Sequence, residues 1–160
     1  MSVLKDSRIP MSWPLAYIGV SKDFISPTEA MEEICEGAND EGSVKMIEDY
    51  YSEAGEAKED FLKFVNRKFH FNQNEIDISN FIWGIGYLNQ VYNANLTKQE
   101  KLSEIAKIWA KFHYPPTWKA FIYYMPVRDD QDSGIDDVYG RFSNFIELEV
   151  RKLVGAQKHH

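Results

Sequence analysis

"ISNFIWGIGYLNQVYN", residues 78–93, is the segment on which the fold depends. Its apolar residues recur at helical spacing, at Phe81, Ile82, Ile85, Leu88, Val91 and Tyr92. Gly84 and Gly86 oppose a helix, because each costs about 1 kcal/mol relative to alanine in a helix interior. The same glycines would let another helix approach closely. We expect a buried central helix here, with a β-strand as the alternative.

Helical periodicity continues on the N-terminal side of this segment. Ser26 is three residues before Glu29, which is the spacing of a capping box, and Pro27 occupies the first helical position. Three successive helices are predicted from this point. Their apolar faces comprise Ala30, Met31, Ile34 and Cys35; Val44, Ile47, Tyr51 and Ala54; and Ala57, Phe61, Phe64, Val65 and Phe69.

Residues 110–126, AKFHYPPTWKAFIYYMP, predict a turn between two helices. A helix that begins with the capping box of Thr97 and Glu100 ends near His113, because Pro115 disfavours helical geometry at the residue before it. Pro116 can begin a short second helix, and a long third helix follows. The apolar faces comprise Leu102, Ile105, Ile108, Trp109 and Phe112; Trp118, Phe121, Ile122 and Met125; and Ile135, Tyr139, Phe142, Ile146, Val150 and Leu153.

These patterns predict an all-α, single-domain helical bundle of about seven helices. The 160 residues are enough to bury a core in one domain, and no internal repeat or linker divides them. We assign residues 1–157 to the domain and interpret residues 158–160, KHH, as a purification-tag remnant. No apolar run is long enough to span a bilayer, and the N-terminus lacks the apolar segment of a secretion signal. The single cysteine suits a reducing compartment, so we expect a cytoplasmic protein.

Charge is distributed unevenly along the chain, whose net charge is −7. Residues 29–60 contain twelve acidic residues and two lysines, a net charge of −10, so the rest of the chain is +3. A second acidic cluster follows at residues 128–137, RDDQDSGIDD. Direct nucleic-acid binding is disfavoured, because phosphate contacts require a basic surface. A basic protein partner is favoured, with a plain solvated surface as the alternative.

Catalytic and metal-binding patterns are weak. His70 and His113 have no histidine or cysteine at helical spacing, and residues 129–140 fail the EF-hand template because Gly140 occupies the position of the bidentate glutamate. We expect no metal and no cofactor. Cys35 is expected to be a buried structural cysteine, because an acidic helix disfavours its thiolate. Paired carboxylates that act as acid and base are not excluded by the sequence.

Two pairs of adjacent tyrosines offer possible binding residues. Neighbours on a helix diverge by about 100°, so at least one ring of the Tyr50–Tyr51 pair and one of the Tyr123–Tyr124 pair should be partly exposed. Exposed tyrosines commonly anchor protein interfaces. The alternative is that these rings lie at the edge of the core with their hydroxyls in water.

Two stretches carry a family resemblance. WPLAYIGVSKDFISPTEA near the start contributes Trp13, Tyr17, Gly19, Phe24, Ile25 and Ser26. The second stretch contributes Leu102, Ile105, Phe112, Tyr114, Pro115, Phe121, Ile122, Tyr124, Met125 and Pro126. Together they resemble the bacterial domain-of-unknown-function family 2247, although Lys111 stands where an aspartate is expected and Phe24 where a tryptophan is expected. The resemblance implies an all-α bacterial protein, with no established enzymatic role, that looks like the immunity proteins encoded beside polymorphic or contact-dependent toxins.

We therefore expect a non-enzymatic immunity protein that binds a cognate toxin domain, a nuclease (RNase or tRNase) of a contact-dependent inhibition system. Nucleases are basic, so an acidic inhibitor can cap their substrate site. Two alternatives are a small enzyme with carboxylates in an aromatic pocket and an acidic adaptor without a toxin partner. The expected partner-binding residues are Asp129, Asp130, Asp132, Asp136, Asp137, Glu48, Asp49, Tyr50, Tyr51, Glu53, Glu56 and Tyr123.

Overall fold

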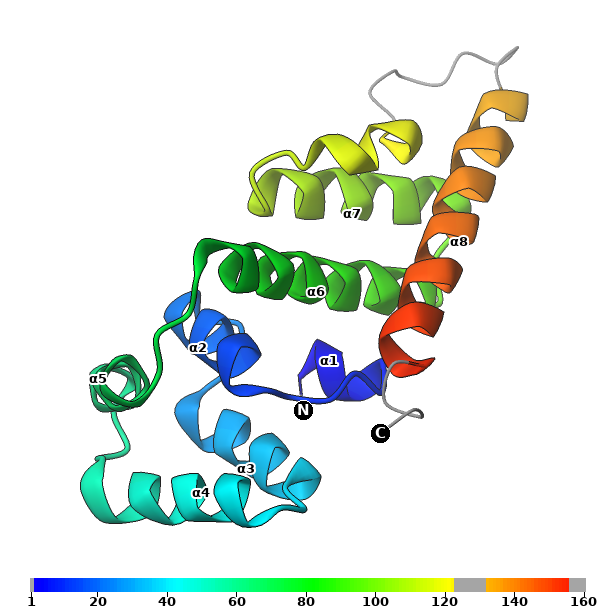
Figure 1. Ribbon diagram of the computed structural model, residues 1–160. Coiled ribbons are helices and arrows are strands. Elements are labelled where there is room, and N and C mark those ends of the chain that lie inside the picture. The colour runs from blue at the N-terminus through cyan, green and yellow to red at the C-terminus, as the bar shows by residue number, and fades with distance from the viewer. Residues whose placement is uncertain (1, 123–131, 156–160) are drawn as a thin grey trace. The chain divides into compact units, whose positions relative to one another are not determined.

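All regular structure in the described part of the chain is helical. The computed structural model describes residues 2–122 and 132–155, so the predicted tag remnant at 158–160 lies outside it. Within these ranges are eight α-helices and one 3-10 helix, and no strand, which confirms the all-α class (Figure 1). The elements are α1 (Val3–Asp6), α2 (Trp13–Ser21), α3 (Pro27–Gly37), α4 (Glu41–Glu53), α5 (Lys58–Lys68), α6 (Gln73–Tyr92), α7 (Lys98–Lys111), η1 (Pro116–Phe121) and α8 (Asp132–Gly155).

Contacts between these elements group into two compact units, Met1–Trp83 and Gly84–His160. The boundary falls inside α6, so this helix contributes its first half to one unit and its second half to the other. The prediction of a single domain over residues 1–157 is not tested by this grouping.

Helices α1 and α2 were not predicted from the sequence. In α2 the buried residues are Leu15, Ala16, Ile18, Gly19 and Val20, and the half-buried residues Trp13, Pro14 and Tyr17 make the other side largely apolar as well. A helix that is apolar on every side has no amphipathic period, so the pattern that reveals the other helices is absent. Its start is nevertheless marked by Ser12, whose Oγ accepts a hydrogen bond from the Leu15 N–H at 3.4 Å.

In the unit Met1–Trp83, α2 packs against both α3 and α5 (Figure 1). Trp83 is fully buried there, and its indole N–H donates to the Leu15 carbonyl at 2.8 Å. The predicted N-cap is confirmed, since the Ser26 Oγ accepts from the Glu29 N–H at 3.1 Å and Pro27 begins the helix. The core of α5 also agrees with prediction, with Phe61, Phe64 and Val65 buried.

The buried face of α4 differs from the predicted one. We expected Val44 and Tyr51 to face inward, but their side chains are 44% and 62% exposed. Tyr50 is buried instead, because its ring packs edge-on against Phe61 and Phe64 of α5. The expectation that one ring of the Tyr50–Tyr51 pair would be exposed is confirmed, although the exposed ring is Tyr51.

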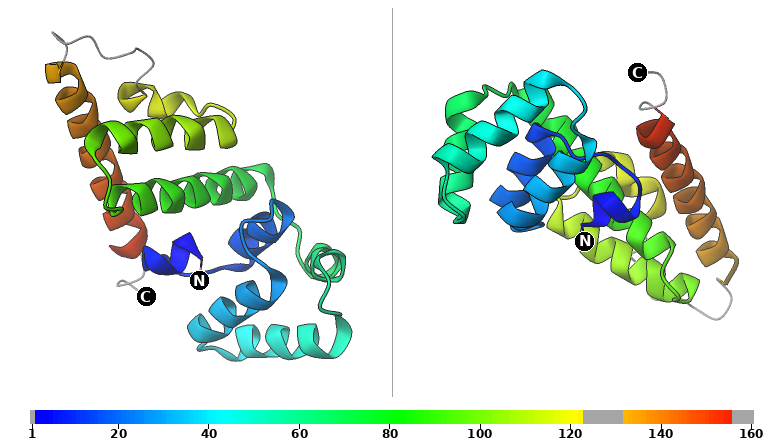
Figure 2. Two further views of the ribbon diagram at one scale, coloured as in Figure 1. Left: turned by 180° about the vertical axis from the view of Figure 1, so that it is seen from behind. Right: turned by 90° about the horizontal axis from the view of Figure 1, so that it is seen from below.

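In the unit Gly84–His160, the second half of α6 contacts α7, η1 and α8. The predicted helix at residues 78–93 is confirmed, and Ile85 and Leu88 are fully buried. Gly84 allows close approach, because a Cβ there would lie 2.8 Å from Trp118 Cζ2 of η1. Helix α8 contacts η1 and α7 and passes the end of α6, as Figure 1 and the reverse view in Figure 2 show.

The turn after α7 is tighter than predicted. Helix α7 ends at Lys111, and His113 and Tyr114 both have positive φ, 62° and 59°. The turn is held because the Trp109 indole N–H donates to the Pro115 carbonyl at 2.9 Å. The short helix after it is a 3-10 helix, and its predicted continuation through Met125 lies outside the described residues.

We predict that Gly84→Ala destabilises the protein by about 1–2 kcal/mol, because the added methyl group would collide with the buried Trp118 ring. Gly140→Ala in α8 is the matched control, since a Cβ there would meet no atom within 4 Å beyond its chain neighbours and the nearby backbone of α8, and alanine favours the helix. Urea denaturation of both variants measures the difference. Equal stabilisation by the two substitutions would contradict the close packing of η1 on α6.

Candidate functional site

Most of the acidic side chains between positions 29 and 60 lie on the surface of the unit Met1–Trp83. On α3 the exposed acids are Glu29, Glu32 and Glu36. On α4, the segment after it and the first turn of α5 they include Glu41, Glu48, Glu53, Glu56 and Glu59. Repulsion between like charges destabilises such a surface unless cations or a partner offset it. Acids that form ion pairs within the protein therefore support the fold, whereas acids without such a pair remain available to bind a partner.

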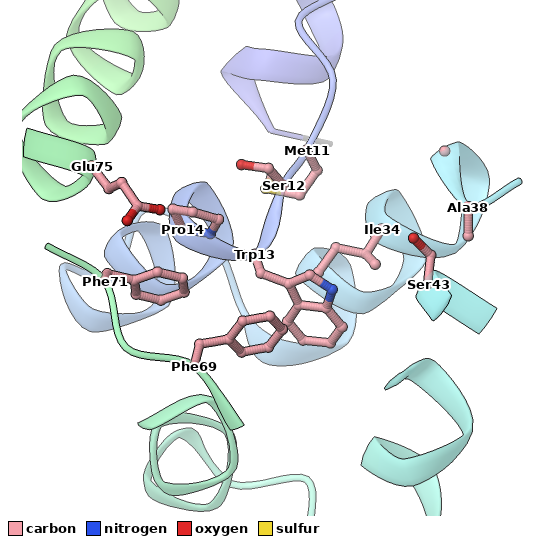
Figure 3. Close-up of a pocket in the computed structure, with 11 residues that line it drawn as sticks. Met11, Ser12, Trp13, Pro14, Ile34, Ala38, Ser43, Phe69, Phe71 and Glu75 are labelled. Carbon is pink, nitrogen blue, oxygen red and sulfur yellow. The ribbon is translucent and has the colours of Figure 1, made fainter. Parts of the chain in front are cut away.

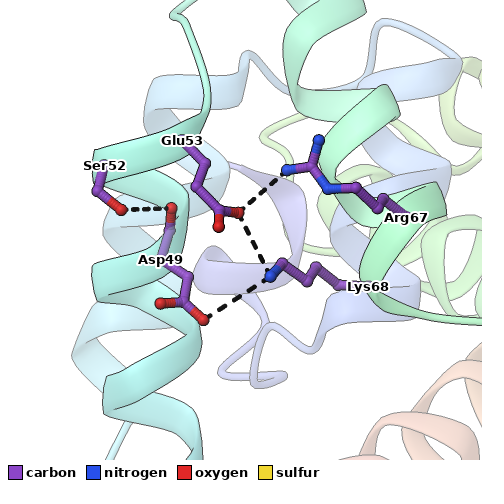
Figure 4. Close-up of polar contacts among 5 residues, drawn as sticks. All are labelled: Asp49, Ser52, Glu53, Arg67 and Lys68. Carbon is purple, nitrogen blue, oxygen red and sulfur yellow. Dashed lines mark hydrogen bonds and ion pairs between the residues drawn. The ribbon is translucent and has the colours of Figure 1, made fainter.

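Asp49 and Glu53 are engaged within the protein (Figure 4). The Glu53 carboxylate accepts a hydrogen bond from Arg67 at 3.0 Å and lies 3.3 Å from Lys68 Nζ, which is also 3.9 Å from Asp49. The two cations come from the last turn of α5, so these pairs connect α4 to α5. In contrast, Glu48 and Glu56 form no ion pair with another described residue.

Tyr51 is the exposed ring of the predicted site. It lines a small pocket of about 210 Å³ together with Met31, Gly55 and Glu56. Partial burial raises the pKa of the Tyr51 hydroxyl, and the neighbouring Cys35 and Glu32 raise it further. Tyr51 lies in the last turn of α4 and Glu56 in the segment after it. Both side chains therefore line the same pocket.

Tyr50 lines the same pocket, but little of its ring is accessible, so its assignment as an interface residue stays a prediction. Its side chain is only 5% exposed, and burial raises the pKa of its hydroxyl. Its ring also stands edge-on to that of Tyr51, with centroids 5.4 Å apart. Tyr50 therefore supports Tyr51 from within the core.

Cys35 is exposed, which corrects the prediction of a buried structural cysteine. The inner face of α3 consists of Ala30, Met31, Ile34 and, unexpectedly, the carboxyl-bearing Glu33. Apolar spacing could not indicate this outcome, because the glutamate is buried through a contact with the N-terminal segment.

That contact is a hydrogen bond from the Ser2 hydroxyl to Glu33 Oε1 at 2.7 Å. The other carboxylate oxygen, Oε2, is buried without a hydrogen-bond partner among the described residues. Desolvation raises the pKa of Glu33, and the Ser2 hydrogen bond and Lys5 oppose the shift only in part. Glu33 lines neither the pocket around Tyr51 nor a second, larger pocket around Trp13 and Phe69.

The remaining predicted residues belong to the unit Gly84–His160 or are not described. Asp136 is exposed and forms an ion pair with Lys98 at 3.0 Å, and Asp137 is exposed. Asp132 begins α8, but its side chain is outside the described part of the structure, as are Asp129, Asp130 and Tyr123 altogether. The structure therefore brings together Tyr50, Tyr51 and Glu56, and separately Asp49 and Glu53.

A larger pocket, of about 400 Å³, was not predicted from the sequence (Figure 3). Its aromatic lining consists of Trp13 from α2 and of Phe69 and Phe71 from the segment between α5 and α6. The Trp13 and Phe69 rings stack with centroids 5.3 Å apart, and the Phe69 and Phe71 rings at 5.5 Å. One signal was present: Phe69 and Phe71 alternate in a chain that leaves α5 in an extended conformation, so both rings point to one side.

The described residues contain neither a candidate metal centre nor a candidate membrane span. Within residues 2–122 and 132–155, no group of three histidine, cysteine, aspartate or glutamate side chains is arranged to hold a metal ion. No helix of the described chain has both the length and the apolar character needed to cross a membrane.

A family model matches residues 1–150, which include all of the unit Met1–Trp83, most of the unit Gly84–His160 and both pockets. The chain belongs to the DUF2247 family. This family is described as an uncharacterized protein conserved in bacteria, which confirms the family resemblance seen in the sequence. No curated protein and no solved structure matches the chain. The function of this DUF2247 protein must therefore be argued from the surfaces described above.

We predict that Glu33→Gln stabilises the protein at pH 7, by about 1 kcal/mol or less, because a neutral amide can accept the Ser2 hydrogen bond without a buried charge. Since the pKa of Glu33 is raised in the folded state, its contribution to stability is present at acidic pH and is lost as the pH rises through that value. The melting temperature of the variant should thus exceed that of the parent at pH 7 and match it at acidic pH. Glu32→Gln on the exposed side of α3 is the control, and an unchanged pH dependence in Glu33→Gln would show that this carboxyl is not responsible.

Proposed function

We propose that this protein is an immunity protein, a non-catalytic inhibitor that binds a cognate bacterial toxin domain in the cytoplasm. The observation that carries the proposal is Tyr51, an exposed ring at the rim of a pocket beside the unpaired acid Glu56. An aromatic anchor next to a concave site, with charges around it, is the usual composition of a binding hot spot.

Charge indicates the kind of partner. Residues 29–60 carry a net charge of −10, and Glu32, Glu48 and Glu56 are exposed without an ion pair to another described residue. Such a surface attracts a basic protein and accelerates its association at low ionic strength. A nuclease, such as an RNase or tRNase of a contact-dependent inhibition system, is basic because its substrate is a polyanion. The same charge disfavours direct binding of nucleic acid.

A carboxylate enzyme is the less favoured alternative. General acid chemistry near neutral pH requires a carboxyl with a raised pKa that can reach a substrate. The carboxyl with a raised pKa, Glu33, is buried against Ser2 and does not line either pocket. An acidic adaptor would use the same surface as an immunity protein, so only the identity of the partner separates these two functions.

Co-expression with the polypeptide encoded immediately beside this protein tests the proposal. If that polypeptide is the cognate toxin, its expression alone should stop growth, co-expression should restore growth, and the two proteins should purify together. Growth arrest that persists without a complex would contradict the immunity function. A stable complex with a polypeptide that is harmless alone would favour the adaptor.

We predict that Tyr51→Ala weakens the complex by about tenfold or more, because it removes the ring that fills the interface. Tyr114→Ala is the matched control, since Tyr114 is 57% exposed and Tyr51 is 62% exposed, but Tyr114 belongs to the other unit. Surface plasmon resonance measures both. Equal affinity of the two variants would contradict the assignment of Tyr51 as the anchor.

We predict that Glu56→Lys slows association by about three- to tenfold at low salt, because it reverses a charge that attracts the partner. The difference from the parent should shrink as salt screens the charges. Glu104→Lys on α7 controls for the change in net charge. An identical effect of both substitutions would show that only the total charge matters.

A further inference from the structure

The aromatic pocket in Figure 3 has a composition that selects its guest. Trp13, Phe69 and Phe71 are only partly buried, although they stack on one another. A monomeric protein rarely leaves three adjacent rings accessible around a concave surface unless a ligand covers them. Ring surface of this kind attracts apolar groups and, through the negative face of the ring, cations.

Glu75 gives the pocket its charge. It is the one ionisable residue in the pocket lining, and Figure 3 shows its carboxylate on the Phe71 side. Its position is set by a capping box at the start of α6, in which the Glu75 N–H donates to Asn72 Oδ1 at 2.8 Å and Glu75 Oε1 accepts from the Asn72 N–H at 3.3 Å. Glu75 forms no ion pair with another described residue, so its charge is available to a guest.

Trp13 supplies a hydrogen-bond donor. The indole N–H groups of Trp83 and Trp109 donate to the carbonyls of Leu15 and Pro115. The Trp13 N–H has no acceptor within residues 2–122 and 132–155. The Trp118 N–H has none there either, but it is buried in the unit Gly84–His160, whereas Trp13 lines the pocket. A pocket that combines ring faces, a carboxylate and a free N–H donor suits a cationic side chain attached to a polypeptide backbone, whose carbonyl can accept the N–H.

We propose that this pocket binds an arginine side chain of a polypeptide partner. The guanidinium group is planar, stacks on aromatic rings and presents a fork of donors that matches a carboxylate, so it fits the rings and Glu75 better than an ammonium group does. The proposal deepens the proposed function, since it gives the basic partner a second point of attachment on the unit Met1–Trp83. Binding of an isolated arginine peptide does not, however, depend on the identity of that partner.

The test uses blocked tripeptides and the indole N–H resonances of the ¹⁵N-labelled protein. The chain contains four tryptophans, and Trp13→Phe assigns the Trp13 resonance by its loss. The probe is Gly-Arg-Gly, and the matched control is Gly-citrulline-Gly, in which an uncharged urea replaces the guanidinium at nearly the same shape. Titration of the arginine peptide should move the Trp13 resonance with a dissociation constant on the order of 1 mM, while the Trp83 and Trp109 resonances stay in place.

The citrulline peptide should bind at least about threefold more weakly, because it cannot pair with Glu75. A lysine peptide should fall between the two. Equal binding of the arginine and citrulline peptides would overturn the proposal in favour of an uncharged guest. A Trp13 resonance that does not move with any peptide would overturn it altogether.

Glu75→Gln tests the role of the carboxylate. Glutamine preserves the capping box, so α6 should remain intact while the preference for arginine over citrulline disappears. Glu56→Gln, at the other pocket, is the matched control and should leave that preference unchanged. If both variants keep the preference, the carboxylate of Glu75 is not the partner of the guanidinium group, and the assignment is wrong.

These outcomes are separate from those of the co-expression experiment. Rescue of growth without any response of the Trp13 resonance would contradict arginine binding at this pocket and leave the proposed immunity function unaffected. A selective response to arginine peptides without a toxin partner would do the reverse.

Discussion

Burial of the central turn of α6 is the constraint on which both compact units depend. Trp83 and Gly84 are adjacent in this helix, yet they serve different units. Trp83 extends its indole into the unit Met1–Trp83, where it donates to the Leu15 carbonyl. Gly84 has no side chain, so Trp118 of η1 can lie against the backbone of α6 in the unit Gly84–His160. At successive positions of one helix, a large side chain thus fills the core of one unit and a missing side chain leaves room for a ring in the other.

The acidic surface combines two roles that a count of charges does not separate. Asp49 and Glu53 stabilise the contact of α4 with α5 through Lys68 and Arg67. These cations also lie in the last turn of α5, where they interact favourably with the helix dipole. Among the described residues no such cation pairs with Glu56, so this acid retains its interaction with a charged partner. This difference is why the proposed binding surface centres on Tyr51 and Glu56.

The sequence predicted elements well wherever one face of a helix is apolar and the other polar. Helices α3, α5, α6, α7 and α8 were expected near their observed positions, and the capping residues Ser26 and Thr97 act as predicted. The prediction failed for α2, which is apolar on nearly every side, and for the orientation of α4. In α4 the two tyrosines are adjacent, so spacing alone could not decide which of them the rings of α5 would hold. For the same reason, exposure of Tyr51 and burial of Tyr50 were decided by packing.

By itself, the sequence determined the all-α class, the starts of the capped helices, the concentration of negative charge in residues 29–60 and the family. These properties depend on residues close together in the chain, or on composition, and so need no tertiary contacts. Only the tertiary structure decided which acids are paired, why Glu33 is buried while Cys35 is exposed, and that Trp13, Phe69, Phe71 and Glu75 line one pocket. Each of these depends on side chains that are distant in sequence and come into contact because the helices pack. Local spacing does not predict such contacts.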